Sequence, residues 1–97
     1  MAGRLHVIAD ITVLNSELYE DYRRQVPAVI EKYGGRYLVR GGASEMLEGE
    51  WQANRLIVLE FPDMDALQRW YRSDDYQVLL RIRQSAARTN LIAVEGV

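Results

Sequence analysis

The chain has 97 residues, of which 12 are basic and 14 acidic, so its formal charge is −2 near neutral pH. It has one histidine, no cysteine, no Gly-rich phosphate loop, no basic block and no run of about 18 apolar residues. These properties argue against disulfides, thiol chemistry, a metal or other cofactor, nucleic acid and a membrane, and we expect one cytoplasmic domain over residues 1–97.

Residues 4–13 form the first expected strand, because they are rich in β-branched and apolar side chains and contain no glycine or proline. A helix follows, with Asn15 or Ser16 as its N-terminal cap and apolar residues at spacings of three and four. The Gly34–Gly35 pair is expected to end this helix, and Pro27 is expected to bend it.

The next two strands are expected at residues 36–42 and 56–61, and a turn around residues 48–50 joins them into a hairpin. A second helical region starts at Pro62–Asp63. Ser73–Asp74 has the character of another N-terminal cap, so we expect the region to break there and restart.

Residues 91–95 are expected to close the domain as a short fourth strand. The resulting order predicts an α+β, ferredoxin-like βαββαβ fold with a four-stranded antiparallel sheet and its helices on one face. Successive strand residues point to opposite sides, so residues such as Ile8, Leu38 and Val58 leave an apolar face without helices. The expected cover is a second copy of the chain, and we predict a homodimer.

Several short motifs point to a family. They are Tyr19, Tyr22, Gly34–Gly35, Tyr37–Gly42, Leu47–Gly49, Glu60–Pro62, Trp70–Tyr71, Ser73, Tyr76 and Arg83. In this order and spacing, over about residues 7–97, the chain resembles the family called domain of unknown function 1330. The resemblance implies a dimeric α+β barrel, in which two ferredoxin-like sheets face each other. Relatives of that type include small monooxygenases, lactone isomerases and ligand-sensing domains, so no single activity is implied.

Arg40 is the first candidate for ligand binding and catalysis. It ends a strand before Gly41 and Gly42, which lack side chains and would let a ligand come close. A guanidinium there could hold a carboxylate through two parallel hydrogen bonds. The alternative is an ion pair with Asp10 or Glu60 on neighbouring strands, with the glycines forming only a bulge.

Asp10 and Glu60 are themselves candidate catalytic residues. Their strands should be adjacent, and neighbouring carboxylates can have their pKa values driven apart into an acid and a base. Whether they share a face depends on the strand register, which a shift of one residue would reverse. The alternatives are pairing with Arg40, hydrogen bonds to the backbone, or a solvated strand end.

Among the aromatic residues on the helices, most of which should pack in the core, Tyr22 and Trp70 are the candidates. Tyr22 lies about one turn before Pro27, where a bent helix could leave space for its phenol beside a ligand. Trp70 could line the same cleft. His6 is expected at the surface or on an edge strand, and Arg83 is expected to reach a carboxylate in a structural role.

The sequence favours a metal-free enzyme that acts on a small oxygenated or aromatic metabolite. In this interpretation Arg40 steadies the metabolite while a carboxylate or Tyr22 moves a proton. The alternative is a non-catalytic small-molecule-binding or stress-related accessory protein that uses the same pocket.

Overall fold

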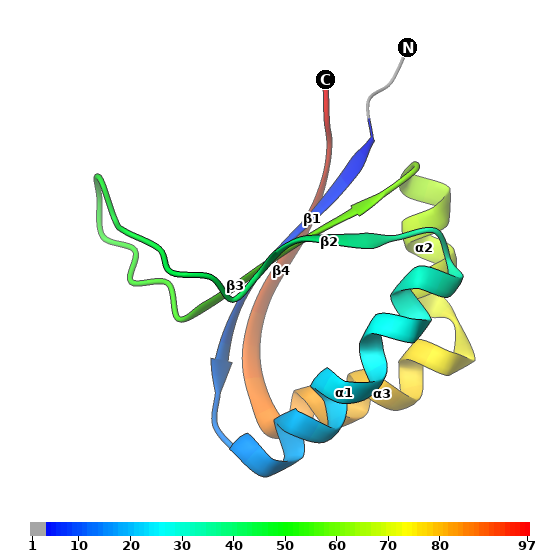
Figure 1. Ribbon diagram of the computed structural model, residues 1–97, viewed down its shortest axis with the longest axis horizontal. Helices are drawn as coiled ribbons and strands as arrows, with labels where there is room; N and C mark the ends of the chain where they lie inside the picture. The colour runs from blue at the N-terminus through cyan, green and yellow to red at the C-terminus, as the bar shows by residue number, and fades with distance from the viewer. Residues whose placement is uncertain (1–3) are drawn as a thin grey trace.

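A four-stranded antiparallel sheet carries helices on one face in the computed structural model, which describes residues 4–97 (Figure 1). The strands are β1 (Leu5–Val13), β2 (Arg36–Arg40), β3 (Arg55–Phe61) and β4 (Ala87–Glu95). The helices are α1 (Ser16–Lys32), α2 (Met64–Arg72) and α3 (Asp74–Ala86). The strand order is β2-β3-β1-β4. The predicted ferredoxin-like α+β fold is confirmed.

Local hydrogen bonds set the helix boundaries as the sequence predicts. The Asn15 side chain accepts a hydrogen bond from the Leu18 amide at 3.1 Å, which starts α1. Gly34 follows the end of α1 with a φ of +85°, a conformation that glycine adopts at little cost. The Ser73 hydroxyl accepts a hydrogen bond from the Tyr76 amide at 3.1 Å, so the expected break between α2 and α3 is confirmed.

The fourth strand is longer than the sequence predicts. β4 begins at Ala87, directly after α3, and not at residue 91. Its partner is the whole of β1, with Val13 opposite Ala87 and Leu5 opposite Glu95. The residues missed are 87–90, of which 88–90 are polar, so the pairing with β1 and not their own apolar pattern makes them a strand.

The second strand ends earlier than expected, at Arg40. The register of β2 against β3 shifts between Tyr37 and Val39, which is the position of a bulge. Gly41 still donates its amide hydrogen bond to the Leu56 carbonyl at 2.8 Å. The sequence offered a bulge at Gly41 and Gly42 as one possibility, but the irregularity of β2 lies before these glycines.

The hydrophobic core lies between the sheet and the helices. Every second residue of β1 points into it, and Leu5, Val7, Ala9 and Ile11 are at most 4% exposed. Behind them, aromatic rings from α2 and α3 pack closely, with the ring centroids of Trp70 and Tyr76 4.1 Å apart. This layer fixes the helices over one face of the sheet.

The opposite face of the sheet has no helix over it, and we call it the open face. The strand pairing places these residues on it: His6, Ile8, Asp10, Arg36, Val39, Leu56, Val58, Glu60, Arg88, Asn90, Ile92 and Val94. Residues 41–54, which we call the arm, connect β2 to β3 and project away from the helices (Figure 1). Ile92 and Trp51 are 62% and 56% exposed, so both the open face and the arm present apolar groups to solvent.

Candidate functional site

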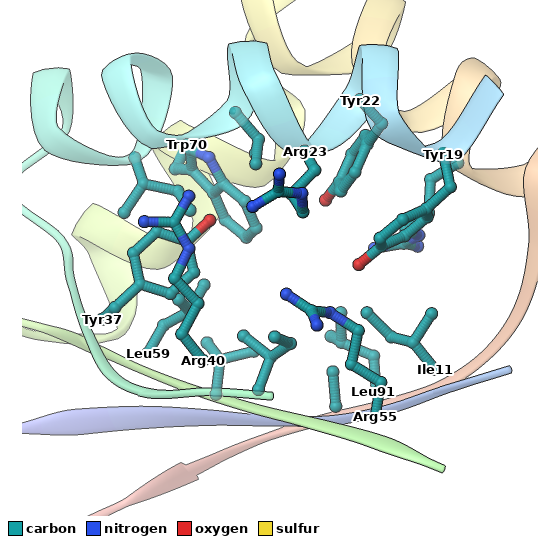
Figure 2. Close-up of a pocket in the computed structure, with 16 residues that line it drawn as sticks. Ile11, Tyr19, Tyr22, Arg23, Tyr37, Arg40, Arg55, Leu59, Trp70 and Leu91 are labelled. Atoms are coloured by element: carbon teal, nitrogen blue, oxygen red, sulfur yellow. The ribbon is translucent and has the colours of Figure 1, made fainter. Parts of the chain in front are cut away.

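A pocket lies on the helix side of the sheet, between α1 and the strands (Figure 2). Its apolar walls come from the core, and its polar side chains come from every helix and from β2 and β3. These are Tyr19, Tyr22, Arg23, Tyr37, Arg40, Arg55, Trp70 and Arg83. The cavity volume is about 30 Å³, room for only one or two water molecules. A metabolite would need the side chains at the pocket mouth to move aside.

A chain of three hydrogen-bonded groups lies beside the pocket, and both of its ends, Tyr22 and Arg83, are among the residues that line it. The hydroxyl oxygens of Tyr22 and Tyr76 are 2.9 Å apart, and Nη1 of Arg83 donates to the Tyr76 hydroxyl at 2.9 Å. Arg83 is 5% exposed and Tyr76 is completely buried. No carboxylate of residues 4–97 forms an ion pair with Arg83. The expectation that Arg83 reaches a carboxylate is therefore wrong, and its partner is a phenol.

The phenols of Tyr22, Tyr37 and Tyr76 remain protonated near neutral pH. Burial raises the pKa of Tyr22 well above its ordinary value, and the neighbouring Tyr76 adds to this. Burial also raises the pKa of Tyr76, although the charge of Arg83 opposes the rise. The pKa of Tyr37 is raised to about 12, again mainly by burial. These phenols can donate hydrogen bonds, but they are poor proton acceptors.

The Arg83 guanidinium remains charged. An arginine side chain is not deprotonated in proteins, even where it is buried. The helix side of the sheet therefore holds a buried cation whose nearest polar partners are neutral groups.

Three buried N–H donors of the pocket find no acceptor among residues 4–97. They are Nε of Arg55, Nε of Arg83 and Nε1 of Trp70. Buried donors of folded proteins are nearly always hydrogen-bonded, because an unpaired one loses its hydration without compensation. The three together make the pocket a place where oxygen atoms of a ligand would be well bound.

Gly41 leaves space for a neighbouring side chain, which is one reason for a glycine at this position. Its φ is +72°, and a Cβ there would lie 2.7 Å from Cζ of Arg55. The chain at Gly41 thus leaves space for the Arg55 guanidinium, whose carbon is 5.9 Å from the centre of the Tyr19 ring. Gly42 is exposed, and a Cβ added there would have open space for at least 4 Å around it.

Arg40 lies in the pocket mouth on the helix side of the sheet. It is opposite Ile57 in the β2–β3 pairing, and its guanidinium carbon lies 4.5 Å from the centre of the Tyr37 ring. Asp10 and Glu60 belong to the open face, so the sheet separates them from Arg40. The alternative in which Arg40 pairs with either carboxylate is wrong.

Asp10 and Glu60 do not form an acid–base pair either. Glu60 lies opposite His6, and Asp10 lies opposite Leu56. The two carboxylates share the open face, yet they are separated by four residues along β1, which is about 13 Å. Their strands are adjacent as predicted, but the register places them at different ends.

Each of these carboxylates has other partners. Asp10 accepts hydrogen bonds from Nε1 of Trp51 at 2.8 Å and from the Asn54 amide at 3.1 Å, and so holds the arm. Glu60 binds Nε of Arg36 at 3.0 Å and Nε of Arg4 at 2.7 Å. Burial would raise the pKa of Glu60, but these two guanidinium groups outweigh it and lower the pKa.

His6 contacts Glu60 on the open face, with 3.7 Å between Nε2 and the carboxylate oxygen. Its strand, β1, is flanked by β3 and β4, so His6 lies on a central strand and not at an edge. The imidazole of His6 is not among the side chains that line the pocket, so His6 does not belong to the candidate site.

Sequence reasoning missed several pocket residues, namely Tyr19, Arg23, Tyr37 and Arg55. Arg55 has a signal that could have been used. It is two and four residues before Ile57 and Leu59, which are buried, so the strand alternation places its charge on the core side. A charged side chain in such a position calls for a partner or a ligand.

Residues 4–97 have neither a membrane-spanning helix nor a cluster of metal-ligating side chains. None of the helices is long and apolar enough to span a membrane. No three His, Cys, Asp or Glu side chains of this part of the chain gather where they could hold a metal ion. The cytoplasmic location stays a prediction.

Known proteins match the chain in sequence and in fold. A family model described as Domain of unknown function (DUF1330) matches residues 4–97, in agreement with the resemblance seen in the motifs. The RPA0582 protein of unknown function from Rhodopseudomonas palustris is similar in structure, with 22% identity and a TM-score of 0.82. That match covers 98% of this chain and 83% of the other. No curated protein matches the chain.

Two further solved structures share the fold at lower identity. SnoaB, a cofactor-independent oxygenase from Streptomyces nogalater, is 12% identical with a TM-score of 0.70, over 99% of this chain and 95% of SnoaB. A dimeric ferredoxin-like protein of unknown function from Thermobifida fusca is 17% identical with a TM-score of 0.51, over 98% and 92% of the two chains. At these identities the comparisons support the fold alone.

Proposed function

The chain belongs to the family described as Domain of unknown function (DUF1330), and we propose that it is a small enzyme that binds an oxygenated aromatic metabolite in the helix-side pocket. The observation that carries the proposal is the set of three buried, unpartnered N–H donors on Arg55, Trp70 and Arg83. A ligand with oxygen acceptors would supply the missing hydrogen bonds, and the surrounding aromatic rings would pack against its body.

The pocket is suited to polarising an oxygen atom of the metabolite. Arg83 and the phenols are donors held in place by the core, and donors fixed in advance stabilise negative charge that develops on an oxygen during a reaction. The two carboxylates that the sequence offered as proton carriers lie on the open face, so we do not assign them a part in this reaction. SnoaB, which shares the fold, is named as an oxygenase that needs no cofactor, which agrees with a metal-free reaction.

The two tryptophans provide a direct test of where a metabolite binds. Trp70 lines the pocket and has a buried indole nitrogen, whereas Trp51 lies on the arm with its indole nitrogen bonded to Asp10. A thermal-shift screen of phenols, quinones and aromatic lactones would first identify compounds that stabilise the protein. A ¹H–¹⁵N spectrum, assigned with Trp51→Phe, would then show which indole N–H responds.

We expect a stabilising compound to shift the Trp70 indole resonance and to leave that of Trp51 unchanged. Arg40→Ala should remain folded, because Arg40 is exposed, and should weaken the binding. Arg88→Ala, which removes the same charge from the open face, should bind like the wild type. Compounds that move only Trp51, or a screen of these classes in which none moves Trp70, would contradict the proposal.

A non-catalytic binding protein is the second candidate. It is favoured by one observation: no carboxylate or imidazole is among the side chains that line the pocket. A reaction there would have to proceed without a side chain that accepts a proton. Mass spectrometry after incubation with the protein separates the two candidates, since an enzyme converts the bound compound and an accessory binding protein returns it unchanged.

We also propose that a second copy of the chain covers the open face. This face and the arm expose apolar side chains, and identical apolar faces can cover each other around a two-fold axis. The Thermobifida fusca protein of similar fold is named as dimeric. Sedimentation at micromolar concentration should therefore show a dimer.

A matched pair of variants tests this pairing. Ile92 on the open face and Val78 on α3 are 62% and 60% exposed. Ile92→Glu would place a charge in the proposed interface and should give a monomer, whereas Val78→Glu should leave the dimer intact. A folded wild-type monomer, or equal effects of the two variants, would refute pairing through the open face.

A further inference from the structure

Positive charge in the pocket exceeds the negative charge that the described residues place near it. Four arginines line it, Arg23, Arg40, Arg55 and Arg83, and no aspartate or glutamate does. Figure 2 shows Arg40 and Arg55 rising from the sheet and Arg23 descending from α1 toward the same space. The acidic residues of the neighbouring strands, Asp10 and Glu60, lie on the other side of the sheet.

Only one of these arginines has a carboxylate partner within the described residues. Arg23 donates from Nε to the Glu20 carboxylate at 2.8 Å. No ion pair within residues 4–97 involves Arg40, Arg55 or Arg83. Arg40 stacks on Tyr37 at the mouth, whereas the other two each have a buried Nε without an acceptor.

The burial of Arg83 makes its positive charge, unpaired within residues 4–97, unfavourable in free energy. Buried charges in proteins are ordinarily paired, because an isolated ion in a medium of low polarity loses most of its hydration energy. Arg83 is 5% exposed, and its hydrogen-bonding partner, Tyr76, stays neutral. A phenol accepts a hydrogen bond from the guanidinium but brings no opposite charge.

We infer that the metabolite is an anion, and that its carboxylate is bound by Arg55 and Arg83 through their unpartnered Nε groups. This inference rests on the proposed function and names the class of metabolite. A carboxylate is planar and accepts several hydrogen bonds, which suits guanidinium donors. The rest of the compound would lie against the apolar and aromatic walls, such as Leu59 and Tyr19.

A pair of probes that differ in charge alone tests the inference. 4-Hydroxybenzoate and 4-hydroxybenzamide have nearly the same shape, but only the first is an anion near neutral pH. The Trp70 indole resonance would report the binding of each in a titration at fixed ionic strength. We expect the carboxylate to bind about tenfold more tightly, because hydrogen bonds to a charged acceptor are stronger than those to a neutral one.

Variants assign the preference to the pocket arginines. Arg55→Gln should reduce the preference for the carboxylate severalfold, and Arg88→Gln, which makes the same change of net charge on the open face, should leave it unchanged. Because Arg83 is buried and its loss could unfold the chain, Arg83→Lys, which keeps the charge, is the second variant. It should remain able to bind the carboxylate, but more weakly, since lysine lacks the Nε donor geometry.

The possible results separate this inference from the proposed function. Equal affinities for the two probes at Trp70 would overturn the inference and leave the proposed function standing. A preference for the carboxylate that Arg55→Gln and Arg88→Gln reduce equally would also overturn it, since general electrostatics would then account for the effect. In a third outcome, neither probe shifts the Trp70 resonance at millimolar concentration, but a neutral oxygenated aromatic compound of the screen does. The inference then fails and the proposed function stands. If no compound shifts the Trp70 resonance, the inference and the proposed function both fail.

Discussion

Removing the Tyr76 hydroxyl should destabilise the protein more than removing the hydroxyl of Tyr22, although the two are hydrogen-bonded to each other. Tyr76 stands in the middle of the chain of hydrogen bonds, bonded to the neutral Tyr22 and to the charged Arg83, at 2.9 Å in both cases. Among residues 4–97, Tyr22 is bonded directly to Tyr76, and it interacts with Arg83 more weakly than Tyr76 does. The variants Tyr76→Phe and Tyr22→Phe therefore remove different numbers of bonds with the same small change in volume.

The magnitudes follow from the kinds of bond. A neutral hydrogen bond contributes about 0.5–1.5 kcal/mol and one to a charged group about 1.5–3 kcal/mol. Tyr76→Phe loses one of each, including the phenol to which the buried Arg83 donates, so we expect a loss of about 2–4 kcal/mol. Tyr22→Phe loses the neutral bond alone, which is about 1 kcal/mol.

Urea unfolding of both variants and of the double variant, followed by circular dichroism, measures these losses. The concentration of protein must be the same throughout, because the proposed dimer would unfold at a midpoint that depends on it. The double variant should cost about as much as Tyr76→Phe, since the two hydroxyls share one bond. Equal losses for the two single variants would refute the view that Tyr76 is the main partner of Arg83.

Two other predictions concern a tight contact and an ion pair. A Cβ at Gly35 would lie 2.6 Å from the Phe61 ring, so Gly35→Ala should overpack the core and lower the free energy of unfolding by about 1–3 kcal/mol, as measured with urea. Gly42→Ala is the control, because a Cβ there would have nothing within 4 Å and should cost little. The pKa of Glu60 is lowered in the folded protein, burial being outweighed by Arg36 and Arg4, so its contribution is present above the ordinary glutamate pKa and is lost as the pH falls through the lowered one. Glu60→Gln should therefore flatten the dependence of stability on pH in that acid range, and an unchanged acid limb in urea titrations would contradict this.

The parts of the fold that the sequence predicted well depend on local interactions. The starts of α1 and α3 follow from Asn15 and Ser73, whose side chains bond to amides three residues further on. The extent of β4 was predicted poorly because residues 88–90 become a strand only through β1, which is far away in the sequence. Interactions within a few residues leave a pattern in the sequence, and pairing between distant segments does not.

The candidate site divides in the same way. Arg40, Tyr22 and Trp70 were identified from local features, and all three line the pocket. Their proposed connection to Asp10 and Glu60 failed because it depended on the register and on the face of each strand. The contact between Arg83 and Tyr76 could have been predicted from the sequence, because residues seven apart on a helix lie on the same side, two turns apart. The bond from Tyr76 to Tyr22 joins residues 54 positions apart and has no local signal.

Strand alternation explains how the chain keeps Asp10 and Glu60 apart from the pocket arginines of β2 and β3. Asp10 and Glu60 occupy positions that point to the open face, whereas Arg40 and Arg55 occupy positions that point to the helices. The sheet between them prevents the contact that would neutralise both sets, and each set must find other partners. On the open face the carboxylates bind Arg4, Arg36 and the arm. On the helix side Glu20 pairs with Arg23, but no carboxylate of residues 4–97 forms an ion pair with Arg40 or Arg55. The same alternation that builds the core therefore leaves a positively charged pocket beneath α1.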